Sequence, residues 1–190
     1  MRKLVLLFVA LAAPAWAATP SEGVALSVRR GFFTETDIGG YLNVGGDDGY
    51  SNLQTYLQLG VGYDVSEAIE LGVHFGLGSN AADCYSGRNG RGDCTLTDNF
   101  TLSFIDLTAA YLIRMRDRFY FTPKVAVGYT LLDPPPVLDV KGGLNVGGGV
   151  GVEYVTSMDH FSIGFDVLSR FIIGPNILSL QFYPRVKYTF

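Results

Sequence analysis

The sequence predicts an all-β protein, an eight-stranded antiparallel transmembrane β-barrel of the outer-membrane type. Three observations support this prediction. The chain begins like an exported protein, its later apolar residues alternate with polar or small ones, and the alternating segments number eight. Each segment is near the length that crosses a bilayer as a tilted strand.

The N-terminal segment has the parts of a secretory signal peptide. Arg2 and Lys3 precede an apolar stretch, 4–13, and the small residues Ala15 and Ala17 follow it. The stretch is about half as long as a membrane-spanning helix needs. We therefore expect residues 1–17 to be a cleaved signal peptide and residues 18–190 to form one β-barrel, exported through the periplasm to the cell outer membrane.

Composition favours strands over helices. The mean hydropathy is +0.24 and 48% of the residues are hydrophobic, yet no later run of eighteen apolar residues offers a transmembrane helix. The 24 glycines and the 13% of aromatic residues favour turns and pleated sheets. The net charge of −4 argues against nucleic acid as a partner.

The strands are recognised by a period of two residues. In 69–78 the apolar residues from Ile69 to Leu77 take every second position, and in 52–63 those from Leu53 to Tyr63 do the same. The eight expected strands are 32–43, 52–63, 69–78, 101–114, 119–130, 145–154, 161–171 and 178–190. The fourth is less regular, because it carries Phe104 on its expected inner face.

Alternation alone does not say which face points inward, since a soluble lipocalin-like barrel turns its apolar side chains to the interior. Aromatic residues at strand ends, such as Tyr63, Tyr129 and Tyr188, are typical of membrane interfaces. The opposite face is too charged for a lipid pocket. We therefore expect the apolar face to contact outer-membrane lipids.

The lengths of the connections also alternate. Short turns are expected near Ser66, Asp117 and Asp159, and longer loops at 46–50, 79–99 and 132–142, with a tight fourth loop at 174–176. Outer-membrane barrels have short periplasmic turns and long external loops. Both termini of the barrel are therefore expected on the periplasmic side.

Charged residues share the expected inner face with one histidine. The predicted interior network comprises Glu35, Asp37, Asp64, Glu70, His74, Asp106, Arg114, Lys124, Glu153, Asp166, Arg170, Arg185 and Lys187. The two signs are nearly balanced. Because an eight-stranded barrel has room only for side chains, we expect these charges to pair across a filled lumen rather than line a transport pore.

The longest external loop carries both cysteines. In an oxidising compartment Cys84 and Cys94 most simply form one disulfide, and no histidine lies nearby to favour a metal site. The same loop offers contact candidates at Tyr85, Arg88, Arg91 and Asp93, and the prolines at 134–136 form part of another external rim.

The residues predict no catalytic site. His74 lies in the middle of a strand and His160 at a short turn, and neither has an evident nucleophile partner. The chain also lacks the GxSxG elbow of serine hydrolases. We therefore expect the protein not to be an enzyme, with no catalytic residue, cofactor or metal.

Five stretches carry a family resemblance. They are 31–39 (GFFTETDIG), 45–52 (GGDDGYSN), 57–64 (LQLGVGYD), 128–134 (GYTLLDP) and 184–190 (PRVKYTF). Together they resemble the CglE-like outer-membrane β-barrel proteins of adventurous gliding motility. The resemblance implies an interaction role in surface gliding without pili, and transfer between cells by contact. It implies no active site.

The last strand ends on Phe190, with Tyr188 and Val186 at the alternate positions before it. A terminal aromatic residue in this pattern is what the barrel-assembly machinery reads, so that machinery is an expected partner. Other motility or envelope proteins are further expected partners. The alternative function is that of a general small surface protein for adhesion or envelope integrity.

Overall fold

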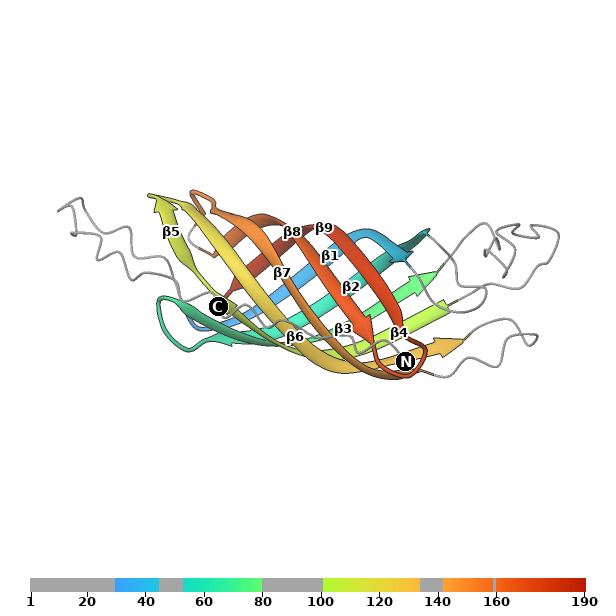
Figure 1. Ribbon diagram of the computed structural model, residues 1–190. Coiled ribbons are helices and arrows are strands. Elements are labelled where there is room, and N and C mark those ends of the chain that lie inside the picture. Colours follow the sequence, from blue (N-terminus) through green and yellow to red (C-terminus); the bar gives the residue numbers. More distant parts are fainter. Residues whose placement is uncertain (1–29, 45–52, 80–100, 134–141, 159) are drawn as a thin grey trace.

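The computed structural model describes residues 30–44, 53–79, 101–133, 142–158 and 160–190, and these residues form a closed barrel (Figure 1). Nine strands lie in this described part: β1 (Phe32–Val44), β2 (Leu53–Asp64), β3 (Ile69–Ser79), β4 (Thr101–Tyr111), β5 (Ile113–Arg116), β6 (Phe119–Asp133), β7 (Gly143–Val155), β8 (Phe161–Ile172) and β9 (Ile177–Thr189). The described residues include no helix long and apolar enough to cross a membrane.

The sheet closes on itself through antiparallel pairs. Strands that follow one another along the chain pair with each other, except that β4 pairs with β6, and β1 pairs with β9 from Phe33↔Thr189 to Val44↔Leu178. Both β4 and β5 pair with β6, so they are one barrel strand interrupted at Leu112. The prediction of a closed eight-stranded antiparallel barrel is confirmed.

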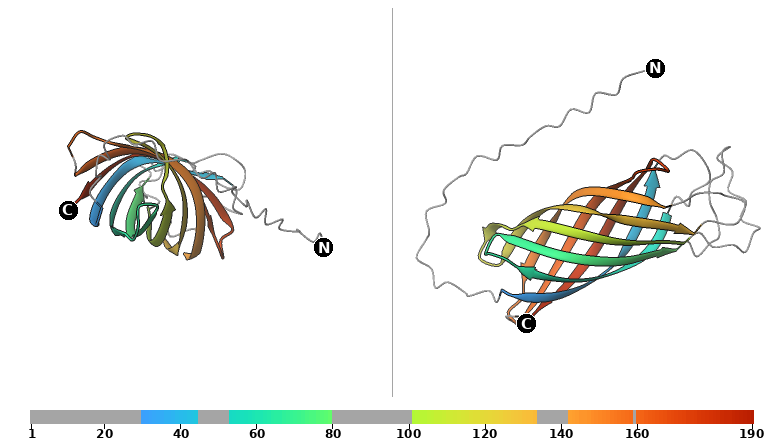
Figure 2. Two further views of the ribbon diagram at one scale, coloured as in Figure 1. Left: turned by 90° about the vertical axis from the view of Figure 1, so that its left-hand side faces the viewer. Right: turned by 90° about the horizontal axis from the view of Figure 1, so that it is seen from below.

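The strands run obliquely to the long axis of the barrel (Figure 2). The turns after β2, β5 and β7 lie at one end, together with Arg30 and Phe190, and we call this the short-turn end. The opposite end, the long-loop end, holds the tight turn between β8 and β9. Gly174 in that turn has a φ of 113°, a left-handed conformation that favours glycine, and Asn176 has a φ of 55°.

The two faces of each strand differ sharply in exposure. In β3, Val73 is 41% exposed and Phe75 48%, whereas His74 between them is 4% exposed. The outward rows of the other strands are apolar in the same way, while charged and amide side chains are buried inside. This inversion of the usual soluble pattern is what a barrel surrounded by lipid requires.

An aromatic girdle surrounds the barrel at the short-turn end. Its exposed rings belong to Phe32, Tyr63, Tyr111, Phe119, Phe161 and Phe190. The ring of Tyr188 joins two of them, with centroid distances of 4.9 Å to Phe161 and 5.0 Å to Phe190. Since aromatic rings gather at the level of lipid headgroups, the girdle places this end of the wall at a membrane surface.

A second aromatic group lies inside the barrel. Tyr56 packs between Tyr183 and Tyr41, with ring centroids 5.6 Å and 6.1 Å away, and lies 6.3 Å from Phe104. The space for the Phe104 ring comes from Gly76 on the neighbouring strand, where an added Cβ would meet the ring carbons. This cluster fills the lumen on the side of the charged residues that faces the long-loop end.

One predicted interior residue lies elsewhere. Arg114 is exposed in β5, and its guanidinium contacts the Asp117 carboxylate at 3.5 Å in the adjoining turn. Leu112, Tyr120 and Val155 already fill the mouth of the barrel at this end. The alternating pattern therefore runs past the last layer of the interior, and the assignment of Arg114 to the lumen network is wrong.

Several sequence-based expectations lie outside the described residues and stay predictions. They concern the signal peptide 1–17, the disulfide between Cys84 and Cys94, the loop contact candidates Tyr85, Arg88, Arg91 and Asp93, and the prolines at 134–136.

Replacing Gly76 by alanine should destabilise the barrel, because the new methyl group must displace the Phe104 ring from its cluster. We expect the free energy of unfolding to fall by about 1–3 kcal/mol, as measured by urea unfolding of the protein in phospholipid vesicles. Gly148→Ala is the matched control, since the nearest atom to an added Cβ there is the Lys124 carbonyl oxygen at 3.8 Å. Equal stability of the two variants would contradict the tight packing at Gly76.

Candidate functional site

The interior of the barrel is the part of the described structure with the greatest concentration of ionisable groups. Along each strand every second side chain points into the barrel, and the closed wall removes those side chains from water. The buried charged residues are Glu35, Asp37, Asp64, Glu70, Asp106, Lys124, Glu153, Asp166, Arg170, Arg185 and Lys187, with His74 among them. The sequence-based network is thus brought together, apart from Arg114.

Arg185 on β9 is the hub of this network. Its Nη2 lies 3.0 Å from Glu153 Oε2 and its Nε lies 3.2 Å from Asp166 Oδ2. Its Nη1 lies 3.6 Å from Glu35 Oε2 and 3.8 Å from Glu70 Oε1. One fully buried guanidinium therefore faces carboxylates from four other strands, which its planar fork of donors suits.

Two lysines extend the network toward the short-turn end and along the wall. Lys187 Nζ lies 2.5 Å from Glu70 Oε2 and 3.2 Å from Asp64 Oδ1, and it lies 4.1 Å from the centroid of the Phe33 ring. Lys124 Nζ donates to Asp166 Oδ2 at 3.0 Å. Because removing either lysine would leave a buried carboxylate with fewer partners, both are structural residues of the interior.

A separate group lies beside the aromatic cluster. Arg170 forms an ion pair with Asp106, and its guanidinium carbon lies 3.9 Å from the centroid of the Phe104 ring. The Asn145 amide donates to Asp106 Oδ1 and to Thr130 Oγ1, both at 3.0 Å. Through Arg170, this group contacts both an acidic side chain of the interior and the aromatic cluster around Tyr56.

His74 is held between two polar partners. Its Nε2 contacts a carboxylate oxygen of Glu35, and its Nδ1 lies 3.1 Å from the Thr108 hydroxyl oxygen. An added Cβ at Gly60 would meet both the His74 ring and the Glu35 side chain. The histidine therefore sits in a fitted position within the network.

The interior charges are less evenly matched than the sequence pattern indicated. Seven carboxyl side chains and four lysine or arginine side chains are buried in the described part of the barrel. Asp37 accepts a hydrogen bond from the Gln58 amide at 2.6 Å, while its other oxygen has no hydrogen-bond partner among the described residues. The described part of the lumen therefore carries more acidic than basic side chains.

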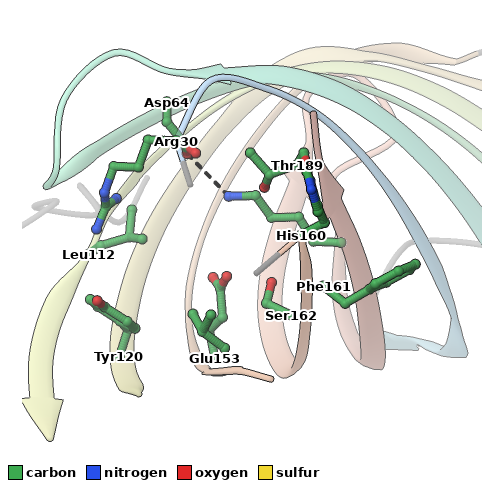
Figure 3. Close-up of a pocket in the computed structure, with 11 residues that line it drawn as sticks. Arg30, Asp64, Leu112, Tyr120, Glu153, His160, Phe161, Ser162 and Thr189 are labelled. Carbon is green, nitrogen blue, oxygen red and sulfur yellow. Dashed lines mark hydrogen bonds and ion pairs between the residues drawn. The ribbon is translucent and has the colours of Figure 1, made fainter. Parts of the chain in front are cut away.

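A pocket opens at the short-turn end of the lumen (Figure 3). Arg30 and Tyr120 line one side of it, and Glu153 and Ser162 line the other. His160 lies at its edge, where its Nδ1 donates to the Thr189 carbonyl oxygen at 2.6 Å. This bond ties the turn before β8 to the end of β9.

Sequence reasoning missed some residues of the interior. Gln58, Thr108 and Asn145 complete the hydrogen bonds of charged neighbours, and their shared inward parity is the signal that could have found them. Arg30 was missed because it precedes the first alternating segment. The structure places Phe190 at the short-turn end, where its backbone N–H donates to the Phe32 carbonyl oxygen at 2.9 Å.

Comparison with protein families gives a match to the model of the outer membrane protein beta-barrel domain over residues 4–190. A search of curated proteins finds no match.

Solved structures with a similar fold include Neisserial surface protein A, which is 14% identical with a TM-score of 0.62 over 84% of this chain and 97% of that one. Ail, the attachment invasion locus protein of Yersinia pestis, is 14% identical with a TM-score of 0.50 over 85% of this chain and 100% of that one. At this level of identity the likeness concerns the fold.

One sequence-based prediction is corrected by these comparisons. The outer membrane enzyme PagL is among the similar structures, at 12% identity and a TM-score of 0.47 over 83% of this chain and 99% of that one. The prediction that the chain is not an enzyme, which rested on sequence motifs, does not stand.

Replacing Arg185 by methionine should destabilise the barrel strongly, because several buried carboxylates lose their shared counter-charge. We expect a loss of about 3–5 kcal/mol in the free energy of unfolding, measured in urea with the protein in phospholipid vesicles.

Arg114→Gln is the matched control, since it removes an exposed guanidinium whose ion pair contributes at most about 1 kcal/mol. If the Arg185 and Arg114 variants unfold at the same urea concentration, the interior network does not stabilise the barrel.

Proposed function

Because this chain belongs to the outer membrane protein beta-barrel domain family, we propose that it serves in the outer membrane as an interaction component of adventurous, pilus-independent gliding motility. The observation behind this proposal is the resemblance of the five stretches to CglE-like proteins. The location in the outer membrane follows from the family itself and from the apolar outer face of the barrel.

The resembling stretches fall on parts of the barrel with different tasks. Four of them, 31–39, 57–64, 128–134 and 184–190, lie wholly or almost wholly in β1, β2, β6 and β9 and contribute to the wall, where glycine and aromatic alternation is common to many barrels. The stretch 45–52 follows β1 in the sequence and lies outside the described residues. Because the longer loops of outer-membrane barrels face outward, we propose that this stretch is available to partners outside the cell.

The interior supports a role as a rigid platform. Arg170 and Arg185 are each 1% exposed, and the aromatic cluster around Tyr56 fills the lumen above them. A filled barrel holds the ends of its strands at fixed separations. This suits a protein that presents a binding surface to motility or envelope proteins, which we propose as partners.

Assembly is the second proposed interaction. Phe190 is 60% exposed at the end of β9, in an aromatic row with Tyr188. We propose that this terminal row is recognised by the barrel-assembly machinery during insertion. Outer-membrane lipids then surround the exposed apolar face.

A second candidate function is that of a small surface protein for adhesion or envelope integrity. The observation that favours it is the fold shared with Ail, whose name refers to attachment. This candidate uses the same external loops and the same rigid barrel. The phenotype of a deletion strain therefore distinguishes the two functions.

Deletion of the gene should impair single-cell gliding in cells that lack pili, and the wild-type gene should restore it. A complementing copy with Arg88→Ala and Arg91→Ala tests the external loop, and it should restore gliding less well than the wild type, as measured by the speed of tracked cells. Glu67→Gln is the matched control, because Glu67 is exposed in the short turn between β2 and β3. Unchanged gliding in the deletion strain, with reduced adhesion or envelope resistance, would favour the second candidate.

A further inference from the structure

The hairpin formed by β5 and the start of β6 differs from the other described turns at the short-turn end. We call residues 113–119, with the sequence IRMRDRF, the basic hairpin. It carries Arg114, Arg116 and Arg118. The described part of the turn between β2 and β3 carries Glu67 instead, and no arginine or lysine is described in the turn between β7 and β8.

The basic hairpin extends beyond the filled part of the lumen. Its strands pair at Ile113↔Phe121, Arg114↔Tyr120 and Arg116↔Phe119, with an irregular register between Arg114 and Arg116. Figure 1 shows β5 as a projection at the end of the barrel that also holds the C terminus. Leu112, Tyr120 and Val155 close the interior here, so Arg114 and Arg116 do not turn into the lumen and stay exposed, while Arg118 is half-buried.

The outer side of the basic hairpin is apolar and continuous with the aromatic girdle. Ile113 is 41% exposed, Met115 68% and Phe119 48%, and Tyr111 of the girdle precedes them at the same parity. Phe119 also packs on Tyr154 with ring centroids 5.0 Å apart. The hairpin therefore combines apolar side chains at the depth of the girdle with cations at the edge of the membrane.

The cations of the basic hairpin are weakly engaged by the protein. Arg114 contacts only the exposed Asp117, at 3.5 Å, among the described residues, and such surface pairs contribute little. Arg116 forms no ion pair with any described residue, while Arg118 donates to the Thr156 carbonyl oxygen at 2.7 Å. Two guanidinium groups thus remain available to an external anion.

We propose that the basic hairpin binds the phosphate groups of anionic phospholipids in the periplasmic leaflet. The short-turn end faces the periplasm in barrels of this family. A guanidinium group pairs with a phosphate through two parallel hydrogen bonds, and the apolar row of Ile113 and Met115 contacts the acyl chains of the same lipid. This combination favours a lipid over an acidic protein. A protein partner would have to cover the apolar side chains of Ile113 and Met115, which lie at the level of the aromatic girdle where lipids already surround the barrel.

The proposal is tested by native mass spectrometry of the detergent-solubilised full barrel with a phosphatidylglycerol. The wild type should bind it more tightly than a phosphatidylcholine with the same acyl chains. The double variant Arg114→Gln/Arg116→Gln should weaken phosphatidylglycerol binding by about fivefold or more, as expected for loss of basic residues at an anionic surface.

Glu67→Gln is the matched control and should leave phosphatidylglycerol binding unchanged, and the mobility difference between unheated and boiled samples in detergent gels verifies that each variant is folded. Binding of phosphatidylglycerol by the double variant at the wild-type affinity would overturn the proposal. So would equal wild-type affinity for the two lipids, or displacement of phosphatidylglycerol by inorganic phosphate.

Discussion

Closure of the sheet between β1 and β9 is the constraint on which the rest of the structure depends. In hydrocarbon each backbone N–H and C=O needs a partner within the protein, so a sheet with an open edge cannot span a membrane. The pairs from Phe33↔Thr189 to Val44↔Leu178 remove that edge. Closure also creates a narrow interior into which alternate side chains of every strand must fit.

The closing strand carries the cations that this interior needs. Arg185 on β9 faces carboxylates of β1, β3, β7 and β8, and Lys187 on the same strand faces those of β2 and β3. These contacts exist only when the last strand has taken its place beside the first. The wall and the interior side chains therefore stabilise each other. Gly76 leaves room for the Phe104 ring, and Gly60 leaves room for the His74 ring.

The period of two residues was enough to predict the barrel and the inward side of twelve of the thirteen network residues. It was wrong for Arg114, because parity does not reveal where the filled interior ends. It could not assign partners either, since the acids that meet Arg185 come from strands far apart in the sequence. Nor did it indicate the cluster around Tyr56, where Gly76 on a neighbouring strand provides the space. Each of these depends on register across the closed sheet.

A barrel filled by side chains fits a rigid membrane protein and does not fit a channel. The most direct test of this account is the conductance of the purified wild-type protein in a planar lipid bilayer. The account predicts no discrete ion-conducting steps, because Arg170, Arg185 and the aromatic cluster occupy the lumen. Reproducible steps of uniform amplitude would contradict it.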